Sequence, residues 1–158
     1  MKKTNPKLWG KLQAQLAPGE LKLDSATLEG HQGDKWFATG RPEAVALPRS
    51  SKAVSTILRF AHRHQIPVTP RGAGYGYVGG CVPLRGGIAL SVARMRRIKE
   101  IHEADFVAVV QPGVITADLQ TKAEAKGLYY PPDPASRADC SIGGNVATNA
   151  GGPRCLKY

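Results

Sequence analysis

The chain lacks the features that mark membrane, secreted and metal-binding proteins. No segment approaches the roughly 20 consecutive apolar residues of a membrane span, and the lysine-containing N-terminus lacks the apolar core of a signal peptide. The cysteines, Cys81, Cys140 and Cys155, are odd in number and far apart, which supports neither a disulfide framework nor a zinc site. We therefore expect a cytoplasmic protein with free thiols and without a metal ion.

Negative charge is also scarce, since 22 lysines and arginines face 12 acidic residues, for a net charge of +10. A basic domain is a candidate for binding nucleic acid. However, its basic residues are scattered apart from a cluster at positions 94–99, and they are not interleaved with aromatic residues. We interpret that cluster as a solvated face and expect no nucleic-acid partner. Acidic surface on a further part of the protein is another way to balance the charge.

Glycine, by contrast, is in excess, at 18 of 158 residues against a usual share of about 7%. Much of it lies in residues 72–87 and 143–152. Dense glycine marks backbone that approaches something closely, or φ angles that other residues avoid.

Hydrophobic periodicity and turn residues predict a mixture of helices and strands. The expected helices cover 4–17, 50–64 and 117–126, and the expected strands cover 44–47, 68–69, 88–91, 98–101 and 107–110. Ser50 or Ser51 is expected to cap the second helix and Thr116 the third. Residues 24–43 are expected to be irregular. Adjacent strand pairs mixed with helices favour an α+β fold.

The glycine loop, residues 70–80, follows a predicted strand and is typical of an anion-binding backbone. Gly74, Gly76 and Gly79 match Gly-x-Gly-x-x-Gly, but residues 81–87 have no helical period and contain a proline. Because the Rossmann motif must open a helix, we reject that interpretation. No Gly-Lys-Ser/Thr follows, which excludes the Walker motif. A plain glycine-rich turn is the alternative, and Arg71 either adds charge or braces the loop.

The second glycine segment, residues 141–152, combines small residues with the amides and hydroxyls of Asn145, Thr148 and Asn149. Such backbone can pack against a flat ring or a phosphate, although a tight helix–sheet contact is the alternative. Two such segments about 65 residues apart are better explained by one elongated ligand than by two unrelated turns. FAD has that shape.

Together these residues resemble the FAD-binding domain of the vanillyl-alcohol-oxidase/PCMH superfamily of FAD-linked oxidases, especially that of bacterial glycolate oxidase and of D-lactate and other D-2-hydroxyacid dehydrogenases. The matching stretches are 47–50, 66–68, 70–74, 109–114, 130–136 and 142–153. The resemblance implies an α+β PCMH-type domain over 43–158, incomplete at its C-terminus, after an N-terminal helix and irregular lead-in over 1–42. The chain would supply the first α+β subdomain and the beginning of the second.

The resemblance also implies which residues contact FAD: the glycine loop at the pyrophosphate, and the later residues at the ribityl chain, pyrophosphate and isoalloxazine ring. They are Arg71, Gly72, Ala73, Gly74, Tyr75, Gly76, Gly79, Gly80, Pro132, Asp133, Ser136, Ile142, Gly143, Gly144, Asn149, Gly151 and Gly152. Tyr75 and Val78 depart from the family, which often has small hydroxyl residues there. No histidine lies in 70–80, so FAD would be bound non-covalently.

The function implied is the FAD-binding part of an oxidoreductase acting on a 2-hydroxy acid such as glycolate or D-lactate. The acid pocket and catalytic residues of relatives lie beyond Tyr158, and the chain's four histidines match no family site, so the chain alone is expected to be inactive. It would be a truncated product, an isolated domain or half of a split protein. Partner subunits or a separately encoded C-terminal half are expected, and the missing half would dock on an exposed hydrophobic sheet edge. Partner subunits could hold the protein at the periphery of a membrane. The alternative is a non-catalytic nucleotide-binding or subunit-interaction module.

Overall fold

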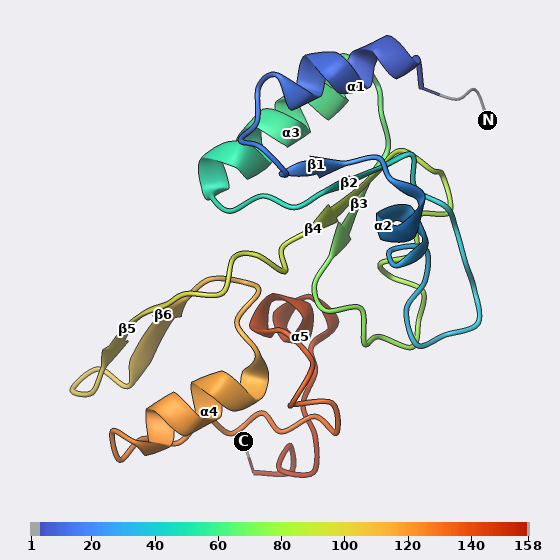
Figure 1. Cartoon of the computed structure of the whole chain (residues 1–158). Helices are drawn as coiled ribbons and strands as arrows, with labels where there is room; N and C mark the ends of the chain where they lie inside the picture. The colour runs from blue at the N-terminus through green and yellow to red at the C-terminus, as the bar shows by residue number, and fades with distance from the viewer. Residues whose placement is uncertain (1–3, 158) are drawn as a thin grey trace.

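The computed structural model describes residues 4–157, and its elements fall into two groups joined after residue 91 (Figure 1). The first group contains α1 (Pro6–Gln13), β1 (Leu21–Lys22), α2 (Ser25–Glu29), β2 (Ala44–Ala46), α3 (Ser51–Arg63), β3 (Val68–Arg71) and β4 (Ile88–Ser91). The second contains β5 (Ile98–His102), β6 (Val107–Val110), α4 (Thr116–Glu124) and α5 (Ile142–Thr148). This arrangement confirms the α+β fold class.

The first group is built on a four-stranded sheet in the order β1-β2-β4-β3. The central strand β4 pairs in parallel with both β2 and β3, while β1 is antiparallel to β2. All four residues of β4 are buried, as expected for a strand enclosed on both faces. β3 is left at the edge of the sheet, and it leads directly into the glycine loop.

Alternation along the strands divides the core between the two faces of the sheet. Ile88 on β4 packs with Leu12 of α1 and Ile57 of α3, all fully buried. On the opposite face, Val45 and Ala89 pack with Leu28 of α2. Figure 1 shows α1 and α3 together on one side of the sheet and α2 on the other.

The second group is a two-stranded antiparallel ribbon, β5–β6, with the helices α4 and α5 beside it. Its core cluster joins Val114, Leu119 and Ile142. Along β6, Val107 and Val109 are 49% and 40% exposed, and Phe106 in the preceding turn is 81% exposed. Within residues 4–157, β6 pairs only with β5. The predicted exposed hydrophobic strand edge is therefore present at β6.

Several local predictions are confirmed. Ser50 caps α3 by accepting the Ala53 N–H at 3.2 Å, and residues 98–101 and 107–110 form the predicted strand pair.

Three local predictions are wrong. The first helix ends at Gln13 rather than 17, and residues 24–43 are not wholly irregular, because Asp24 caps the short helix α2. Thr116 does not cap α4: Ile115 stands at the N-cap, and the buried Thr116 hydroxyl donates instead to the Cys140 carbonyl. Because the Thr116 hydroxyl is buried, it needs an internal acceptor, and it finds one in Cys140, which is distant in sequence, instead of capping its own helix.

Candidate functional site

The glycine loop leaves β3 at Arg71 and continues through residues 72–81 as bends and turns, with no helix. The rejection of a Rossmann motif is therefore confirmed. Gly74 and Gly79 have φ angles of +80° and +70°, a region that glycine enters at little cost. These two positions turn the chain sharply at the start and the end of the loop.

The backbone N–H groups of residues 72–78 have no hydrogen-bond acceptor within the part of the chain that the structure describes. Their residues are partly or fully exposed, so an external acceptor can reach them. Buried amides are nearly always paired, and a run of consecutive unpaired amides in turn conformations forms a concave anion site. Seven successive donors are thus available to a ligand such as a phosphate.

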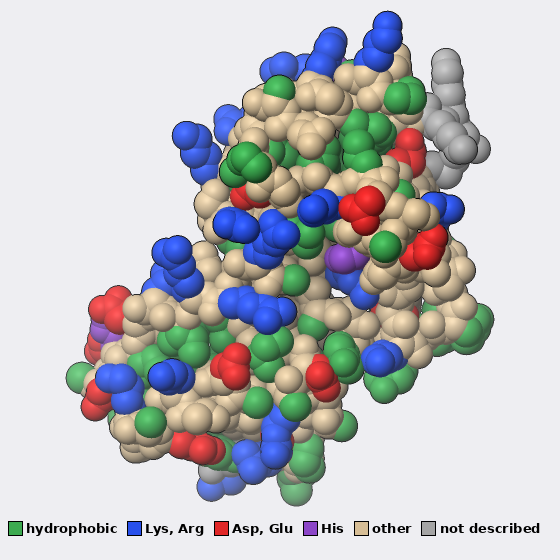
Figure 2. All heavy atoms as spheres, viewed as in Figure 1, with side chains coloured by type: hydrophobic (Ala, Val, Ile, Leu, Met, Phe, Trp, Pro, Cys, Tyr) green, Lys and Arg blue, Asp and Glu red, His purple; other side chains and the backbone are tan. Residues whose placement is uncertain are grey.

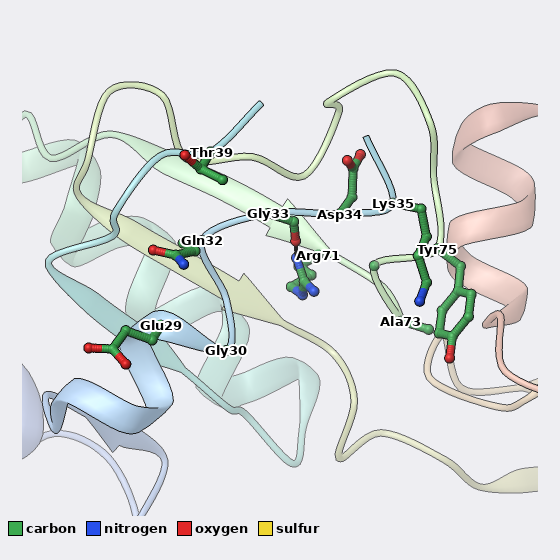
Figure 3. A pocket seen from close by; sticks show the side chains of 11 residues that line it. Glu29, Gly30, Gln32, Gly33, Asp34, Lys35, Thr39, Arg71, Ala73 and Tyr75 are labelled. Atoms are coloured by element: carbon green, nitrogen blue, oxygen red, sulfur yellow. Dashed lines mark hydrogen bonds between the residues drawn. The ribbon is translucent and has the colours of Figure 1, made fainter. Parts of the chain in front are cut away.

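Arg71 lies behind the loop and braces it. Its guanidinium donates to the carbonyl oxygen of Gly33 (Figure 3) and lies 3.4 Å from the Cys81 sulfur. A Cβ at Gly74 would collide with this guanidinium. Of the two roles considered for Arg71, the structure supports bracing. Burial raises the pKa of the Cys81 thiol despite the neighbouring guanidinium, so this cysteine is not an activated thiolate.

A four-residue stretch, residues 33–36, lies along the loop, and we call it the brace segment. The Lys35 N–H donates to the Gly76 carbonyl at 3.0 Å. The Gly79 N–H donates to Asp34 Oδ2, also at 3.0 Å. The Lys35 ammonium lies 4.6 Å from the centre of the Tyr75 ring, within cation–π range. Figure 3 shows the hollow that forms between this segment and the loop.

Sequence reasoning missed the brace segment. Its contacts join residues roughly 40 positions apart, and no periodicity marks such a pairing in advance. The only local signal is an aspartate after a glycine, Gly33-Asp34, which is typical of a turn.

The second glycine segment differs from the prediction because much of it forms the helix α5. Ser141 caps the helix by accepting the Gly144 N–H at 3.3 Å. The Ile142 N–H donates to Val114 and the Gly143 N–H to Pro112, each at 2.8 Å. The first turn of α5 therefore has its amides occupied. The glycines serve close packing, since a Cβ at Gly143 would lie 2.7 Å from the Pro112 side chain.

A buried polar chain holds α5 against the start of α4. The Asn145 amide donates to the Thr116 hydroxyl at 2.6 Å, and that hydroxyl donates to the Cys140 carbonyl at 3.3 Å. Thr116 is fully buried and Asn145 is 6% exposed. Each group is thus satisfied internally, as buried polar groups must be.

The fold brings the two glycine-rich segments together. A Cβ at Gly72 would lie 2.5 Å from the Ser141 hydroxyl and 3.3 Å from Gly144 Cα, so glycine at 72 permits the contact. The neighbouring Asp139 carboxylate raises the pKa of Tyr75, which brings the loop close to the residues that precede α5. The glycine loop and the start of α5 therefore share one site region.

Asp133 is engaged in ion pairs rather than free. Its buried carboxylate lies 2.9 Å from Arg137 and 3.6 Å from Arg154, and the hydrogen bond from Arg137 lowers its pKa. Its N–H donates to the Gly151 carbonyl at 2.8 Å. Asp133 thus fastens the end of the second glycine segment to the preceding loop.

The remaining predicted site residues surround this region. Pro132 accepts a hydrogen bond from Gln120 at 3.0 Å, and the Ser136 carbonyl accepts the N–H groups of Asp139 and Cys140. Gly80 is exposed, and Asn149 ends α5 in a left-handed conformation. Gly152, at φ +114°, packs against the Asp133 carbonyl, where a Cβ would collide. Their contacts with a ligand stay predictions.

Other kinds of site find little support in residues 4–157. No group of three or more His, Cys, Asp or Glu side chains there could hold a metal ion, and no helix among them is long and apolar enough to cross a membrane. Figure 2 shows lysines and arginines dispersed over the visible face. The His31 ring donates from Nδ1 to the Thr27 carbonyl oxygen at 2.9 Å, and burial lowers the pKa of this histidine.

A model of one protein family, described as FAD binding domain, matches residues 42–158. The chain belongs to this FAD binding domain family. The match covers both the glycine loop with its free amides and the α5 segment beside it. The resemblance drawn from the sequence, and FAD as the cofactor of the family, are confirmed.

Three relatives illustrate the breadth of similarity within the FAD binding domain family. Glycolate oxidase subunit GlcD of Bacillus subtilis is 47% identical over 117 residues, 74% of this chain and 25% of that protein. D-2-hydroxyglutarate dehydrogenase of Stutzerimonas stutzeri is 40% identical over 98% of this chain and 34% of its own length. D-lactate dehydrogenase of Anaerostipes hadrus is 37% identical over 99% of this chain and 33% of its own length. The chain spans about a quarter to a third of these relatives.

Solved structures agree on the fold of the FAD binding domain. Alkyldihydroxyacetonephosphate synthase matches with a TM-score of 0.88 at 24% identity, over 99% of this chain and 34% of that one. 4-Ethylphenol oxidase from Gulosibacter chungangensis matches with a TM-score of 0.77 at 28% identity. The match covers 89% of this chain and 28% of the oxidase. The PCMH-type architecture is therefore confirmed.

Proposed function

We propose that this chain binds the pyrophosphate of FAD on the amides of residues 72–78, as part of a flavin-dependent oxidoreductase acting on a 2-hydroxy acid. The single observation that carries the proposal is the run of seven unpaired amides. The diphosphate of FAD carries two negative charges, and consecutive free N–H groups are the kind of donor that binds such an anion. The two carboxylates that line the hollow, Glu29 and Asp34, lie outside the glycine loop.

The residues present fit FAD. The free amides would bind phosphate oxygens. The adjoining hollow is lined by two cations, Arg71 and Lys35, and by two carboxylates, Glu29 and Asp34, so the amides rather than a net charge would supply the attraction for an anion. Gly72 keeps the start of α5 within reach of the same ligand. When bound, the flavin supplies the redox chemistry, taking up the electrons removed from the substrate.

The wider set of predicted contacts is part of the same proposal. We expect Gly143 and Gly144 to contribute through their packed backbone surface rather than through their amides, because those amides are occupied. Asp133 would act by holding Gly151. Without a histidine in residues 70–80, binding would be non-covalent.

The substrate class comes from the relatives, whose names specify glycolate, D-lactate and D-2-hydroxyglutarate. All three are 2-hydroxy acids, and we propose a small acid such as glycolate or D-lactate for the complete protein. The subunit name of one relative supports partner subunits for this protein as well.

FAD titration of the purified chain tests the binding proposal. We expect a non-covalent complex, seen as quenching of flavin fluorescence, with all flavin released on denaturation. Gly74→Val should weaken it, because a side chain there collides with Arg71 and the φ angle is unfavourable. Gly127→Val is the control, since it has a similar φ of +68° and open space, far from the loop. Absence of FAD binding by the unaltered chain would reject the proposal.

Substrate assay tests the second part. The FAD-loaded chain alone should leave its flavin oxidised when glycolate or D-lactate is added without oxygen. Adding the polypeptide that completes its relatives' length should allow bleaching of the flavin by one of these acids. Failure with every 2-hydroxy acid tried would favour the non-catalytic alternative.

That alternative, a subunit-interaction module, is favoured by one observation. The apolar side chains of Phe106, Val107 and Val109 are exposed along an unpaired strand edge, where another strand can add. Binding of a partner at this edge without flavin reduction would support it.

A further inference from the structure

We propose that Asp34 is a positioning residue, which acts through the brace segment to hold the glycine loop in its anion-receptive shape. The inference rests on the proposed FAD binding and extends it to a residue outside the glycine loop. Its basis is the set of contacts that residues 33–36 make with the start, middle and end of the loop.

The loop has few means of holding its own shape. Its seven amides at 72–78 make no internal hydrogen bonds within residues 4–157, and glycine is conformationally the freest residue. A loop left free must be ordered when ligand binds, which weakens binding, whereas a loop ordered beforehand avoids this loss. External contacts must therefore supply the order.

The brace segment contacts the loop at its start and at its middle. Arg71, before the loop turns, donates to the Gly33 carbonyl. Gly76, at its middle, accepts the Lys35 N–H at 3.0 Å. This bond turns the Gly76 carbonyl toward the brace, so that its negative end is directed at a donor rather than at an anion among the free amides.

Asp34 closes the far end of the loop. Its Oδ2 accepts the Gly79 N–H at 3.0 Å, and its Oδ1 accepts the Trp36 N–H at 2.8 Å. One carboxylate thus fixes the turn of the brace and the end of the loop together. The Trp36 ring packs against Gly79, at 3.2 Å from the position of a Cβ there. Gly79 consequently gives its amide to Asp34 and shapes the site instead of donating to the ligand.

The negative charge of Asp34 is directed away from the cations of the hollow. Figure 3 shows its side chain pointing to the opposite side of the brace segment from the Lys35 side chain, which extends toward Tyr75. Lys35, Arg71 and Asp34 all line the hollow, and the Asp34 carboxylate is bonded to the end of the loop. Hydrogen bonds to a carboxylate are stronger than neutral ones, which suits a single fastening point.

The test compares Asp34→Ala and Asp34→Asn with Asp24→Ala. Asp24 makes the same kind of bond, accepting the Thr27 N–H at 3.0 Å, but it caps α2 away from the loop. FAD affinity is measured well below the melting temperature of every variant. Amide hydrogen exchange of residues 72–79 is measured without FAD, as a readout that does not depend on the cofactor.

We expect Asp34→Ala to weaken FAD binding about tenfold or more and to speed exchange at Gly79 and its neighbours. Asp34→Asn, which keeps one acceptor oxygen, should fall between it and the unaltered chain, and Asp24→Ala should change neither measurement. Equal affinity and exchange in all proteins would overturn the inference. If the unaltered chain binds no FAD, the proposed function fails, and exchange alone decides the positioning role. If Asp34→Ala does not fold, the FAD affinity and amide exchange of Asp34→Asn, compared with those of the unaltered chain, decide the positioning role.

Discussion

Residues 72–78 and residues 142–144 are both rich in glycine, yet their backbone N–H groups differ in what they bond. In the first stretch the amides have no acceptor within residues 4–157. In the second they bond to Val114, Pro112 and Ser141. Glycine leaves the amides open to solvent in one stretch and permits close packing of α5 in the other. Composition alone does not separate these uses, because both remove a Cβ.

The largest expected effect comes from a side chain at a packing glycine. Gly143→Ala should lower the free energy of unfolding by about 1–3 kcal/mol, because the new Cβ would lie 2.7 Å from Pro112. Gly10→Ala is the matched control: it lies in α1 with nothing within 4 Å of a new Cβ, and should stabilise by about 0.5–1 kcal/mol. Denaturant unfolding measures both. Equal effects would mean that Gly143 is not a packing residue.

The polar chain behind α5 should be nearly as sensitive. Thr116→Val keeps the shape but removes the oxygen that accepts the buried Asn145 amide at 2.6 Å, and should cost about 1–3 kcal/mol. Thr56→Val removes a solvent-exposed hydroxyl bond to Lys52 on α3 and should cost clearly less. A smaller loss for Thr116→Val than for Thr56→Val in chemical unfolding would contradict the assigned role.

The end of the second segment should be sensitive to acid through Asp133. Arg137 lowers the pKa of this carboxyl in the folded chain. Its contribution is therefore present above the unfolded pKa and lost as the pH falls through the folded value. Asp133→Asn should lower the melting temperature at neutral pH. On going from neutral to acidic pH, its melting temperature should then fall by less than that of the unaltered chain.

The control for this prediction is Asp105→Asn, at an exposed position in the turn between β5 and β6. Thermal melts at neutral pH and below the usual aspartate pKa provide the comparison. An acid-induced drop as large in Asp133→Asn as in the unaltered chain would show that Asp133 does not provide it.

The smallest effect on stability is expected in the stretch whose amides are free, residues 72–78. A Cβ at Gly76 would meet only Asp34 Oδ2, at 3.6 Å, which is an ordinary contact, and its φ is not positive. Gly76→Ala should change the free energy of unfolding by no more than about 0.5 kcal/mol. A loss as large as that of Gly143→Ala would remove the distinction between the two stretches.

Local signals were sufficient for much of the fold. Ser50 or Ser51 before an amphipathic run predicted the start of α3, and Pro83 after the glycines excluded a Rossmann helix. Both signals are local, because capping and backbone geometry act over a few residues. The same local reasoning placed no helix in residues 141–152, where Gly143 and Gly144 disfavour one. Tertiary contacts with Pro112 and Val114 overrode that propensity and formed α5.

The sequence by itself determined the glycine loop, the family and FAD as its cofactor, because these depend on residues adjacent in the chain and on their order. Only the tertiary structure decided which glycine amides are free, that Asp34 and Lys35 lie against the loop, and that the Asp133 carboxylate pairs with Arg137 and Arg154. A free amide is defined by the acceptors that the rest of the fold does or does not bring to it. An occupied amide has its acceptor tens of residues away in the chain, as the Gly79 amide has in Asp34.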